Sequence, residues 1–301
     1  IYLPNFKKKD LKLLDTQKKN RIIALLTNPN MSNVRINKTI TKNLKSLKYI
    51  VTASTGTNHI DNELISKNNL ELISLTKDLS VTRKISSTSE LAFALTLAAV
   101  RNIHTSNLSV KKGEWKYLPF VGRQLNGLTI GIIGFGRLGK IYYKFAKAFN
   151  SKILVNDPYI KKSKFKNIRF VSLQTLAKKS DIISCHIHHT DETEKIISRQ
   201  FLKKVKKNLI LINTSRGEII DEKGLIEILE EKKIAGAGLD VYEDELNIPR
   251  KLTKLNNVVI LPHIGSATLE GRHAMGEKVI INIRTFIDGH TPPDKILEGM
   301  L

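Results

Sequence analysis

Apolar positions along this chain form short runs that alternate with segments of helical spacing. The runs predict strands at 128–133, 152–156, 181–187, 208–213, 237–241 and 258–261. Helices are expected at 172–178, 198–204, 222–232 and 269–287, and one more leads from the glycines after residue 133 to residue 150. The runs are nearly continuous Ile, Leu and Val, which is typical of strands covered on both faces. This alternation predicts the α/β class, with a parallel sheet and helices on both of its faces.

The first hundred residues alternate in the same way with shorter elements. Strands are expected at 21–26, 48–52 and 70–75, and a helical segment at 37–47. Ser87 and Glu90 have the spacing of a capping box and are expected to open a helix at 91–103 that is apolar on nearly every side. A helix of this kind is buried in a core or at a subunit interface.

The composition is that of an ordinary globular protein: of 301 residues, 41% are hydrophobic and 26% are charged. This content excludes wholesale disorder. Cys185 is the single cysteine, which excludes an intrachain disulfide and a cysteine metal cluster. The longest apolar stretch is too short to span a bilayer and no signal peptide is visible, so we expect a cytoplasmic protein without a membrane partner. The chain begins with Ile1, which leaves open whether the native N-terminus extends upstream.

The chain carries 50 Lys and Arg against 28 Asp and Glu, a formal net charge of +22. This excess suggests a nucleic-acid partner, because cations that neutralise phosphates drive such binding. Lys residues are scattered over the whole chain, however, and no aromatic stacking motif is interleaved with the short Lys runs. We therefore expect no nucleic-acid partner, and instead a positive field that attracts small anionic substrates and cofactors.

A glycine-rich loop, Gly134-Phe135-Gly136-Arg137-Leu138-Gly139, lies between an expected strand and an expected helix. In a dinucleotide-binding loop, Gly134 permits the turn, Gly136 lets the backbone approach a pyrophosphate, and Gly139 lets helix and strand pack closely. The helix N-terminus adds N–H groups and a partial positive charge. Asp157 ends the next expected strand and is placed to accept hydrogen bonds from the adenosine ribose, which favours NAD over NADP.

Three further segments begin just past the carboxyl ends of expected strands. They are 213–217, 240–245 and 262–265, and they carry Arg216, Glu245 and His263. In a doubly wound sheet, ligands bind beyond the carboxyl ends of the strands. Singly, each residue has an ordinary structural explanation, such as a helix cap or a solvated acid. Their joint placement favours one cleft beside the glycine loop.

On these motifs the chain resembles the D-isomer-specific 2-hydroxyacid dehydrogenases, which include D-3-phosphoglycerate dehydrogenase and the glyoxylate and hydroxypyruvate reductases. The match extends from the loop at 53–61 to the final helix and is most specific at 128–139, 213–217, 235–245 and 261–268. The resemblance implies two Rossmann-like doubly wound domains. A central NAD-binding domain is expected at 101–267, and a discontinuous, flavodoxin-like substrate domain at 1–100 and 268–301, with the active site between them. It also implies a homodimer held partly by the helix at 91–103.

The resemblance assigns catalytic roles that fit the chemistry of three residues. Arg216 would grip a substrate carboxylate and polarise the neighbouring carbonyl. His263, held by Glu245, would give a proton to the C2 carbonyl oxygen as hydride arrives. The remaining cofactor contacts that the resemblance implies are Arg137, Leu138, Thr193, Thr214 and Asp240. For the substrate carboxylate it implies the backbone of Ser54, Thr55, Gly56 and Thr57, beside Arg216.

The sequence also departs from the family pattern. Leu246 replaces the proline that many relatives have after the catalytic glutamate, and His186-Ile187-His188-His189 replaces the usual His-Val-Pro segment. No metal site is expected there, because the histidines lie partly on a strand and lack evident carboxylate partners. The arginines that bind the substrate phosphate in some phosphoglycerate enzymes have no clear match before Ser54.

These features predict an NAD-dependent oxidoreductase that acts on the CH–OH group of a small anionic D-2-hydroxy acid or reduces its 2-oxo acid. The candidate substrates are 3-phosphoglycerate, glycerate with hydroxypyruvate, and glyoxylate. The alternative is an NAD(H)-sensing, partner-binding protein of the same fold, similar to the transcriptional corepressors. The complete catalytic set favours the enzyme.

Overall fold

The computed structural model describes residues 15–27, 35–54, 56–57, 59–75, 83, 85–160, 162–290 and 295–296. The chain divides into two compact units. The first unit comprises Ile1–Ile85 with Ala267–Leu301, and the second comprises Ser86–Ser266. The second unit thus starts about fifteen residues before the boundary expected from the sequence.

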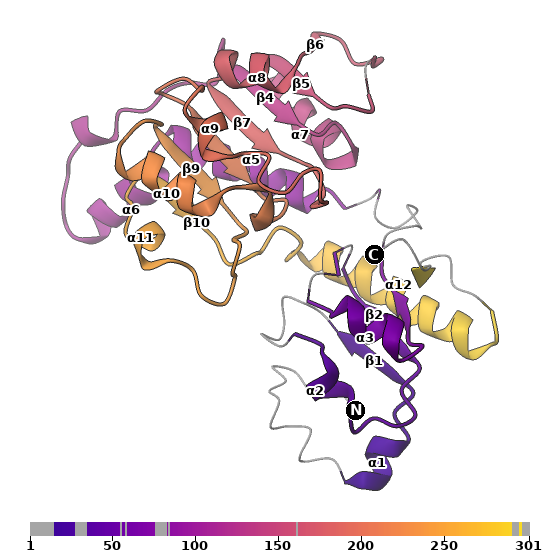
Figure 1. Ribbon diagram of the computed structural model, residues 1–301. Coiled ribbons are helices and arrows are strands. Elements are labelled where there is room, and N and C mark those ends of the chain that lie inside the picture. The colour runs from indigo at the N-terminus through magenta and orange to yellow at the C-terminus, as the bar shows by residue number, and fades with distance from the viewer. Residues whose placement is uncertain are drawn as a thin grey trace. The chain divides into compact units, whose positions relative to one another are not determined.

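The first unit holds a four-stranded sheet in the order β1-β2-β3-β11 (Figure 1). Strands β1 (Ala24–Thr27), β2 (Tyr49–Thr52) and β3 (Glu71–Ile73) are parallel, and β11 (Lys295–Ile296) is antiparallel to β3. Its helices are α1 (Thr16–Asn20), α2 (Lys38–Thr41), α3 (Asn62–Lys67) and α12 (Leu269–Ile287). The bounds of α12 are those predicted. The helix expected at 37–47 is wrong in length, because α2 ends at Thr41 and turns follow it.

The second unit holds a seven-stranded parallel sheet in the order β10-β9-β8-β7-β4-β5-β6. The strands are β4 (Thr129–Ile133), β5 (Lys152–Asn156), β6 (Ile168–Phe170), β7 (Ile182–Cys185), β8 (Ile210–Asn213), β9 (Gly236–Leu239) and β10 (Val258–Ile260). The strand order reverses beside β4, because β5 and β6 extend to one side of it and β7 to β10 to the other. This reversal is the place where doubly wound sheets bind ligands.

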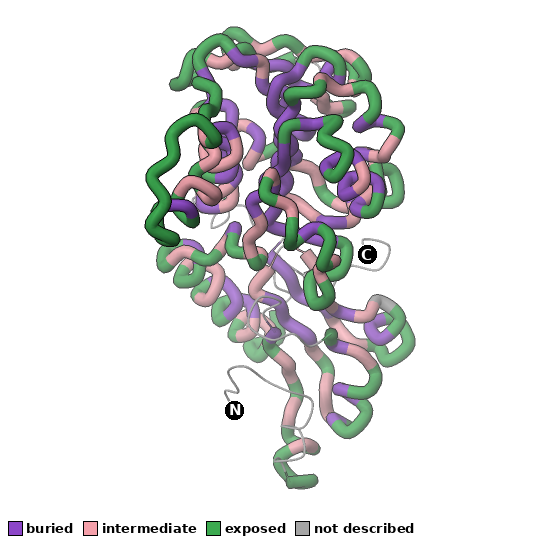
Figure 2. The backbone as a smooth tube through the Cα atoms, turned by 90° about the vertical axis from the view of Figure 1, so that its left-hand side faces the viewer, coloured by how far each residue is buried: buried purple, intermediate pink, exposed green. Residues whose placement is uncertain are grey.

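Helices cover both faces of this sheet (Figure 1). They are α5 (Ser87–Val100), α6 (Ile103–Lys111), α7 (Arg137–Ala148), α8 (Leu173–Lys179), α9 (Arg199–Leu202), α10 (Glu222–Glu230) and α11 (Arg250–Thr253), with 3-10 turns η2 (Leu118–Phe120) and η3 (Gly217–Ile219). Neighbouring residues of β4 lie in different cores: Ile132 packs with α5 and α7, and Ile133 with α8, α9 and α10. Side chains alternate across a strand, so the apolar runs fill two cores. Figure 2 shows the buried backbone running through the middle of this unit.

The helix α5 begins earlier than predicted. Its N-cap is Ser86, whose hydroxyl hydrogen-bonds Glu90, and Ser87 is already buried in the first turn. The predicted capping box of Ser87 and Glu90 is therefore wrong, because four consecutive hydroxyl residues leave the start ambiguous in sequence. The helix packs against α7, β8, β9 and β10, which explains its apolar surface and places it in the second unit.

Two expected absences concern the described part of the chain. No helix there is both long and apolar enough to cross a membrane. Within the same residues, no three His, Cys, Asp or Glu side chains are grouped so as to hold a metal ion. The α/β class and the parallel sheets predicted from the sequence are confirmed.

Candidate active site

The glycine loop connects β4 to α7 at the reversal of strand order. Gly134 has φ +87°, a conformation that side chains rarely adopt, and a Cβ there would meet the backbone of His186. A Cβ on Gly139 would collide with the carbonyl oxygen of Gly134, whereas a Cβ on Gly136 would meet nothing within 4 Å. Gly134 and Gly139 are therefore required by packing. Gly136 borders open space, as expected where a ligand approaches the backbone.

The N-cap of α7 is Gly136, which has no side chain that could accept from the first backbone N–H groups of the helix. These N–H groups and the positive end of the helix dipole favour an anion such as a pyrophosphate. Arg137 is the first residue of the helix, and burial lowers the pKa of its guanidinium. Leu138 is held by its carbonyl oxygen, which accepts a hydrogen bond from the Ser89 hydroxyl at 2.9 Å.

Asp157 lies just after β5 and holds the glycine loop directly. Its Oδ2 accepts the backbone N–H of Phe135 at 2.7 Å, and its Oδ1 accepts those of Tyr159 and Ile160 at 2.9 and 3.1 Å. The sequence predicted this carboxylate beside the glycines, and the structure places it there. Its contact with the loop backbone adds a structural role that the motif alone did not indicate.

Arg216 lies in a tight turn after β8. The Asn213 amide donates to the Arg216 carbonyl at 2.8 Å and accepts the Ser215 N–H at 3.0 Å, and the Ser215 hydroxyl donates to the Cys185 carbonyl at 2.6 Å. Burial lowers the pKa of the Arg216 guanidinium, and the negative charges of Glu218 and Glu245 oppose that shift. A half-buried cation in a rigid turn suits the binding of a carboxylate.

His263 and Glu245 form a pair, with Nδ1 to Oε1 at 2.7 Å. The negative charge of Glu245 favours the charged form of Arg216, so these two side chains are close enough to interact. The structure therefore brings the three predicted catalytic residues into one region of the second unit. His263 has φ +53°, which is an uncommon backbone conformation for a residue other than glycine and occurs often at functional sites. The carboxylate orients the imidazole and turns its Nε2 edge away from Glu245.

Asp240 and Tyr242 support the turn that carries His263. The Asp240 carboxylate is buried at the end of β9 and accepts the N–H groups of Ile264 and Gly265, each at 2.8 Å. Burial raises its pKa, and these hydrogen bonds and the charge of His263 oppose the shift. The Tyr242 hydroxyl donates to the Leu261 carbonyl at 2.9 Å and accepts the Leu261 N–H at 3.0 Å. Sequence reasoning missed Tyr242, because no local pattern indicates the direction of its hydroxyl.

The two predicted threonines lie in different surroundings. Thr193 is a local turn residue, because its hydroxyl hydrogen-bonds the backbone of His188 at 2.7 Å and of Thr190 at 2.8 Å. The buried Thr214 hydroxyl, at the carboxyl end of β8, has no hydrogen-bond partner among the described residues. A buried hydroxyl of this kind is available to a ligand. Together with the open space at Gly136 and the glycine N-cap of α7, it fits a dinucleotide.

Two of the histidines after β7, His186 and His188, have different surroundings. His186 is half-buried, its Nε2 lies 2.9 Å from the Ser184 hydroxyl, and its ring centroid lies 4.9 Å from that of Tyr142. Burial lowers its pKa to about 3, so it is neutral at physiological pH. Burial and then the charge of Arg216 lower the pKa of His188.

The predicted substrate loop lies in the first unit, directly after β2. The Ser54 hydroxyl donates to the Gly56 carbonyl at 2.6 Å and lies 2.8 Å from the Thr52 hydroxyl. Gly56 and Thr57 are half-buried. Thr55 lies outside the described residues.

Comparisons with known proteins agree with this geometry. Residues 93–265 match the family model described as D-isomer specific 2-hydroxyacid dehydrogenase, NAD binding domain. Similar proteins include a glyoxylate reductase of Thermococcus litoralis, 40% identical over 89% of this chain and 82% of that protein. A hydroxypyruvate reductase of Thermotoga maritima is 38% identical over 79% of this chain and 77% of that protein. A D-lactate dehydrogenase structure from Aquifex aeolicus, complexed with NAD and lactic acid, has a TM-score of 0.78 and 27% identity, covering 93% of this chain and 87% of that one.

Proposed function

The chain belongs to the D-isomer-specific 2-hydroxyacid dehydrogenases, and we propose that it uses NADH to reduce glyoxylate to glycolate or hydroxypyruvate to D-glycerate. The observation that carries the proposal is the His263 and Glu245 pair at 2.7 Å in the same region as Arg216. The names of the similar reductases support these two substrates. 3-Phosphoglycerate is the third candidate, and the sequence lacks a clear match to the arginines expected for its phosphate.

In this proposal each of the chain's catalytic groups acts on a different part of the substrate. Bound NADH supplies the hydride that reaches C2 of the 2-oxo acid. Arg216 binds the carboxylate through its guanidinium and polarises the adjacent carbonyl. His263 gives its proton to the carbonyl oxygen, and Glu245 orients the imidazole and stabilises its protonated form. In the direction of oxidation, His263 takes the proton back.

The second unit is the NAD-binding part of the molecule, and we assign the cofactor's pyrophosphate to the glycine loop and the start of α7. Thr214 offers its buried hydroxyl, and Asp157 is assigned to the adenosine ribose. The remaining predicted contacts at Arg137, Leu138, Thr193 and Asp240 belong to this proposal. Ser54 to Thr57 are assigned to the substrate carboxylate, as the family resemblance implies.

The first test is NADH oxidation, followed by absorbance, against glyoxylate, hydroxypyruvate, phosphohydroxypyruvate and pyruvate. We expect turnover with the first two and a loss of about 10²- to 10⁴-fold in kcat for His263→Ala, because the proton donor is removed. NADH binding should be retained in that variant. Unchanged turnover in His263→Ala would refute the mechanism. Absence of turnover with all four 2-oxo acids, together with intact NADH binding, would favour the cofactor-sensing alternative.

We also propose a homodimer, on the basis of an exposed apolar arm at 103–121. Seven of the seventeen large apolar side chains that are exposed in the described part of the chain lie in this arm. Trp115, Tyr117 and Leu118 are 93%, 81% and 79% exposed. Exposed patches rich in Trp and Tyr mark protein interfaces. We expect light scattering to show a dimer for the natural chain and for Leu269→Asp, and a monomer for the double variant Trp115→Ala, Leu118→Asp.

The cytoplasmic location is likewise a proposal, which cell fractionation would test.

A further inference from the structure

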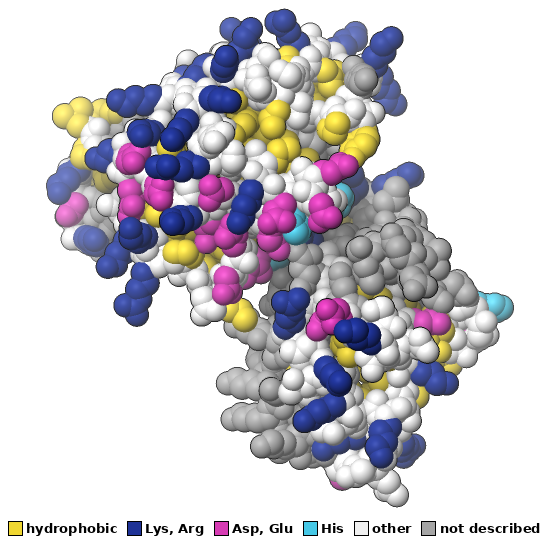
Figure 3. Space-filling model, viewed as in Figure 1, with side chains coloured by type: hydrophobic (Ala, Val, Ile, Leu, Met, Phe, Trp, Pro, Cys, Tyr) yellow, Lys and Arg dark blue, Asp and Glu magenta, His cyan; other side chains and the backbone are white. Residues whose placement is uncertain are grey.

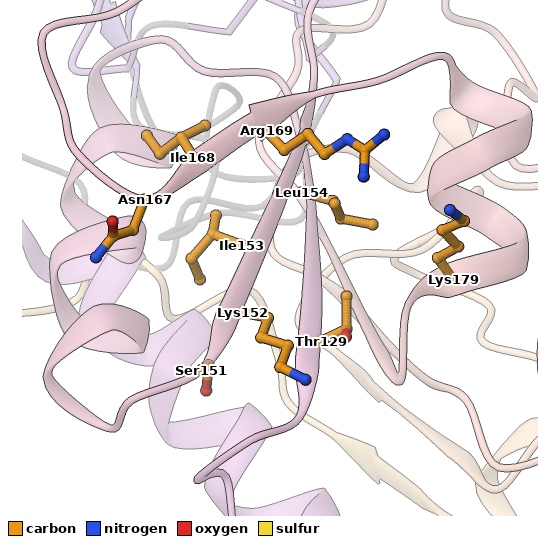
Figure 4. Close-up of a pocket in the computed structure, with 9 residues that line it drawn as sticks. All are labelled: Thr129, Ser151, Lys152, Ile153, Leu154, Asn167, Ile168, Arg169 and Lys179. Atoms are coloured by element: carbon orange, nitrogen blue, oxygen red, sulfur yellow. The ribbon is translucent and has the colours of Figure 1, made fainter.

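A recess of about 590 Å³ opens on the second unit at the amino ends of β4 and β5 (Figure 4). Because the sheet is parallel, this edge lies opposite to the one that carries the glycine loop and His263. The residues that line it are Thr129, Ser151, Lys152, Ile153, Leu154, Asn167, Ile168, Arg169 and Lys179. No acidic residue is among them, and the proposed active site uses none of them.

Three cations reach this recess from three different elements. Lys152 opens β5, Arg169 lies in β6 and Lys179 ends α8, and all three are exposed. Figure 4 shows Arg169 and Lys179 on the same side of β5 as Leu154. Among the ion pairs within 4 Å in the described part of the chain, none involves these three cations.

The carboxylate of Asp181, which lies near the recess, is already neutralised. It accepts the Thr129 N–H at 2.9 Å and lies 3.1 Å from the Lys206 ammonium and 3.5 Å from the Arg123 guanidinium. The positive charge of the recess is therefore not offset by this acid. An anion that enters it would gain charge-assisted hydrogen bonds from several sides.

The surrounding surface is also basic. The sequence from 140 to 180 contains eleven Lys or Arg and one acid, Asp157, which lies at the other end of β5. An adjoining recess of about 540 Å³ is lined by four more lysines, at positions 144, 147, 164 and 166. Figure 3 shows Lys and Arg side chains gathered at the end of the unit where α8 and β6 lie, and acidic side chains gathered near α10.

The interior of the recess is apolar. On the face of the sheet that carries Lys152 and Arg169, the buried Leu154 forms its floor, whereas Ile153 and Ile168 line the recess from the opposite face. The volume exceeds what a single inorganic ion would occupy and lies in the range of small-molecule sites. A cationic rim over an apolar floor fits a ligand with an organic body and a multiply charged anionic group.

We propose that this recess binds a soluble phosphorylated small molecule. Lys152, Arg169 and Lys179 hold the phosphate groups, with the Arg169 guanidinium able to donate two parallel hydrogen bonds. The organic part lies on the apolar floor. This site is separate from the dinucleotide site and does not depend on the proposed reaction.

The test is isothermal titration calorimetry of the full chain, saturated with NAD, against inorganic tripolyphosphate at physiological salt. The site variant is Lys152→Gln, Arg169→Gln, Lys179→Gln. The matched control is Lys204→Gln, Lys223→Gln, Lys254→Gln, which removes three exposed cations outside the recess. We expect the site variant to weaken binding at least about tenfold and the control less than about twofold. Phenyl phosphate should bind the natural chain more tightly than inorganic phosphate, because its ring reaches the floor.

Equal weakening in both variants would show general charge attraction and overturn the proposal, as would absence of binding to the natural chain. Two further probes distinguish other polyanions. A single-stranded oligonucleotide or vesicles of anionic lipid could bind the natural chain more tightly than tripolyphosphate does. If only the site variant loses this binding, the surface binds a polymer or a membrane. That result would also refute the small-molecule site.

Discussion

The sharpest prediction concerns Glu245, whose carboxylate lies 2.7 Å from the Nδ1 of His263. Glu245→Gln keeps the size of the side chain and removes its charge. Two charges at this separation would interact by about 6 kcal/mol at an effective dielectric of 20. The side chains are 26% and 42% exposed, however, so solvent screens most of that value.

The net contribution is better taken as that of a hydrogen bond to a charged group, about 1.5–3 kcal/mol. If this stabilisation is present in the transition state, kcat should fall about 10- to 150-fold. Glu245→Ala removes orientation as well as charge and should lose more. Both variants should bind NADH within about twofold of the natural chain, because neither side chain is among the predicted cofactor contacts.

The assay is steady-state oxidation of NADH with the best 2-oxo acid, combined with a fluorescence titration of NADH. Asp244→Asn is the matched control. Asp244 is adjacent and exposed, and its carboxylate accepts from Leu246 N–H and from the Asn247 amide. A Glu245→Gln variant that retains more than half of the natural kcat would refute the reasoning, as would an equal loss in Asp244→Asn.

Three further predictions rest on single contacts. Gly134→Ala should abolish NADH binding in a fluorescence titration, because φ at Gly134 is +87° and the new Cβ would meet the backbone of His186. Gly276→Ala is the control and should leave NADH binding unchanged, because its Cβ would meet nothing within 4 Å. Tyr242→Phe should lower the free energy of unfolding in urea by about 1–3 kcal/mol, because the Leu261 carbonyl loses its hydrogen-bond donor, while the Leu261 N–H keeps the Leu239 carbonyl; an unchanged midpoint would contradict this. Burial lowers the pKa of His186 from 6.5 to about 3, so the neutral ring stabilises the fold above pH 6.5 and that stability is lost as pH falls towards 3. Between pH 7 and 5 the natural chain should therefore lose about 2 kcal/mol more than His186→Gln in urea unfolding, and parallel losses would show that the shift is absent.

The elements that the sequence predicted well are those with a strong local pattern. The strand at 152–156 and the helix at 269–287 have the predicted bounds, because each combines a clear apolar period with a clear end. The start of α5 was predicted at the wrong serine, since Ser86 and Ser87 are chemically equivalent caps. The helix at 37–47 was overextended, because helical spacing persists in turns that do not continue the helix.

The glycine loop, Asp157 and the three candidate catalytic residues were recognisable in sequence for one physical reason. A parallel sheet places the carboxyl ends of its strands at one edge, so residues that follow those strands share a region whatever their separation along the chain. The structure places His263, Glu245 and Arg216 accordingly. Their catalytic and cofactor roles remain predictions that the variants above test.

By itself, the sequence determined the α/β class, the order of the elements and the edge at which functional groups gather, because these follow from local periodicity and from chain connectivity. Only the tertiary structure decided which groups touch. It turned the Asp240 carboxylate to the His263 loop, packed His186 against Tyr142, and placed Lys152, Arg169 and Lys179 around one recess at the opposite edge. Such contacts depend on side-chain direction and on strands paired across long sequence separations, and no local pattern encodes either.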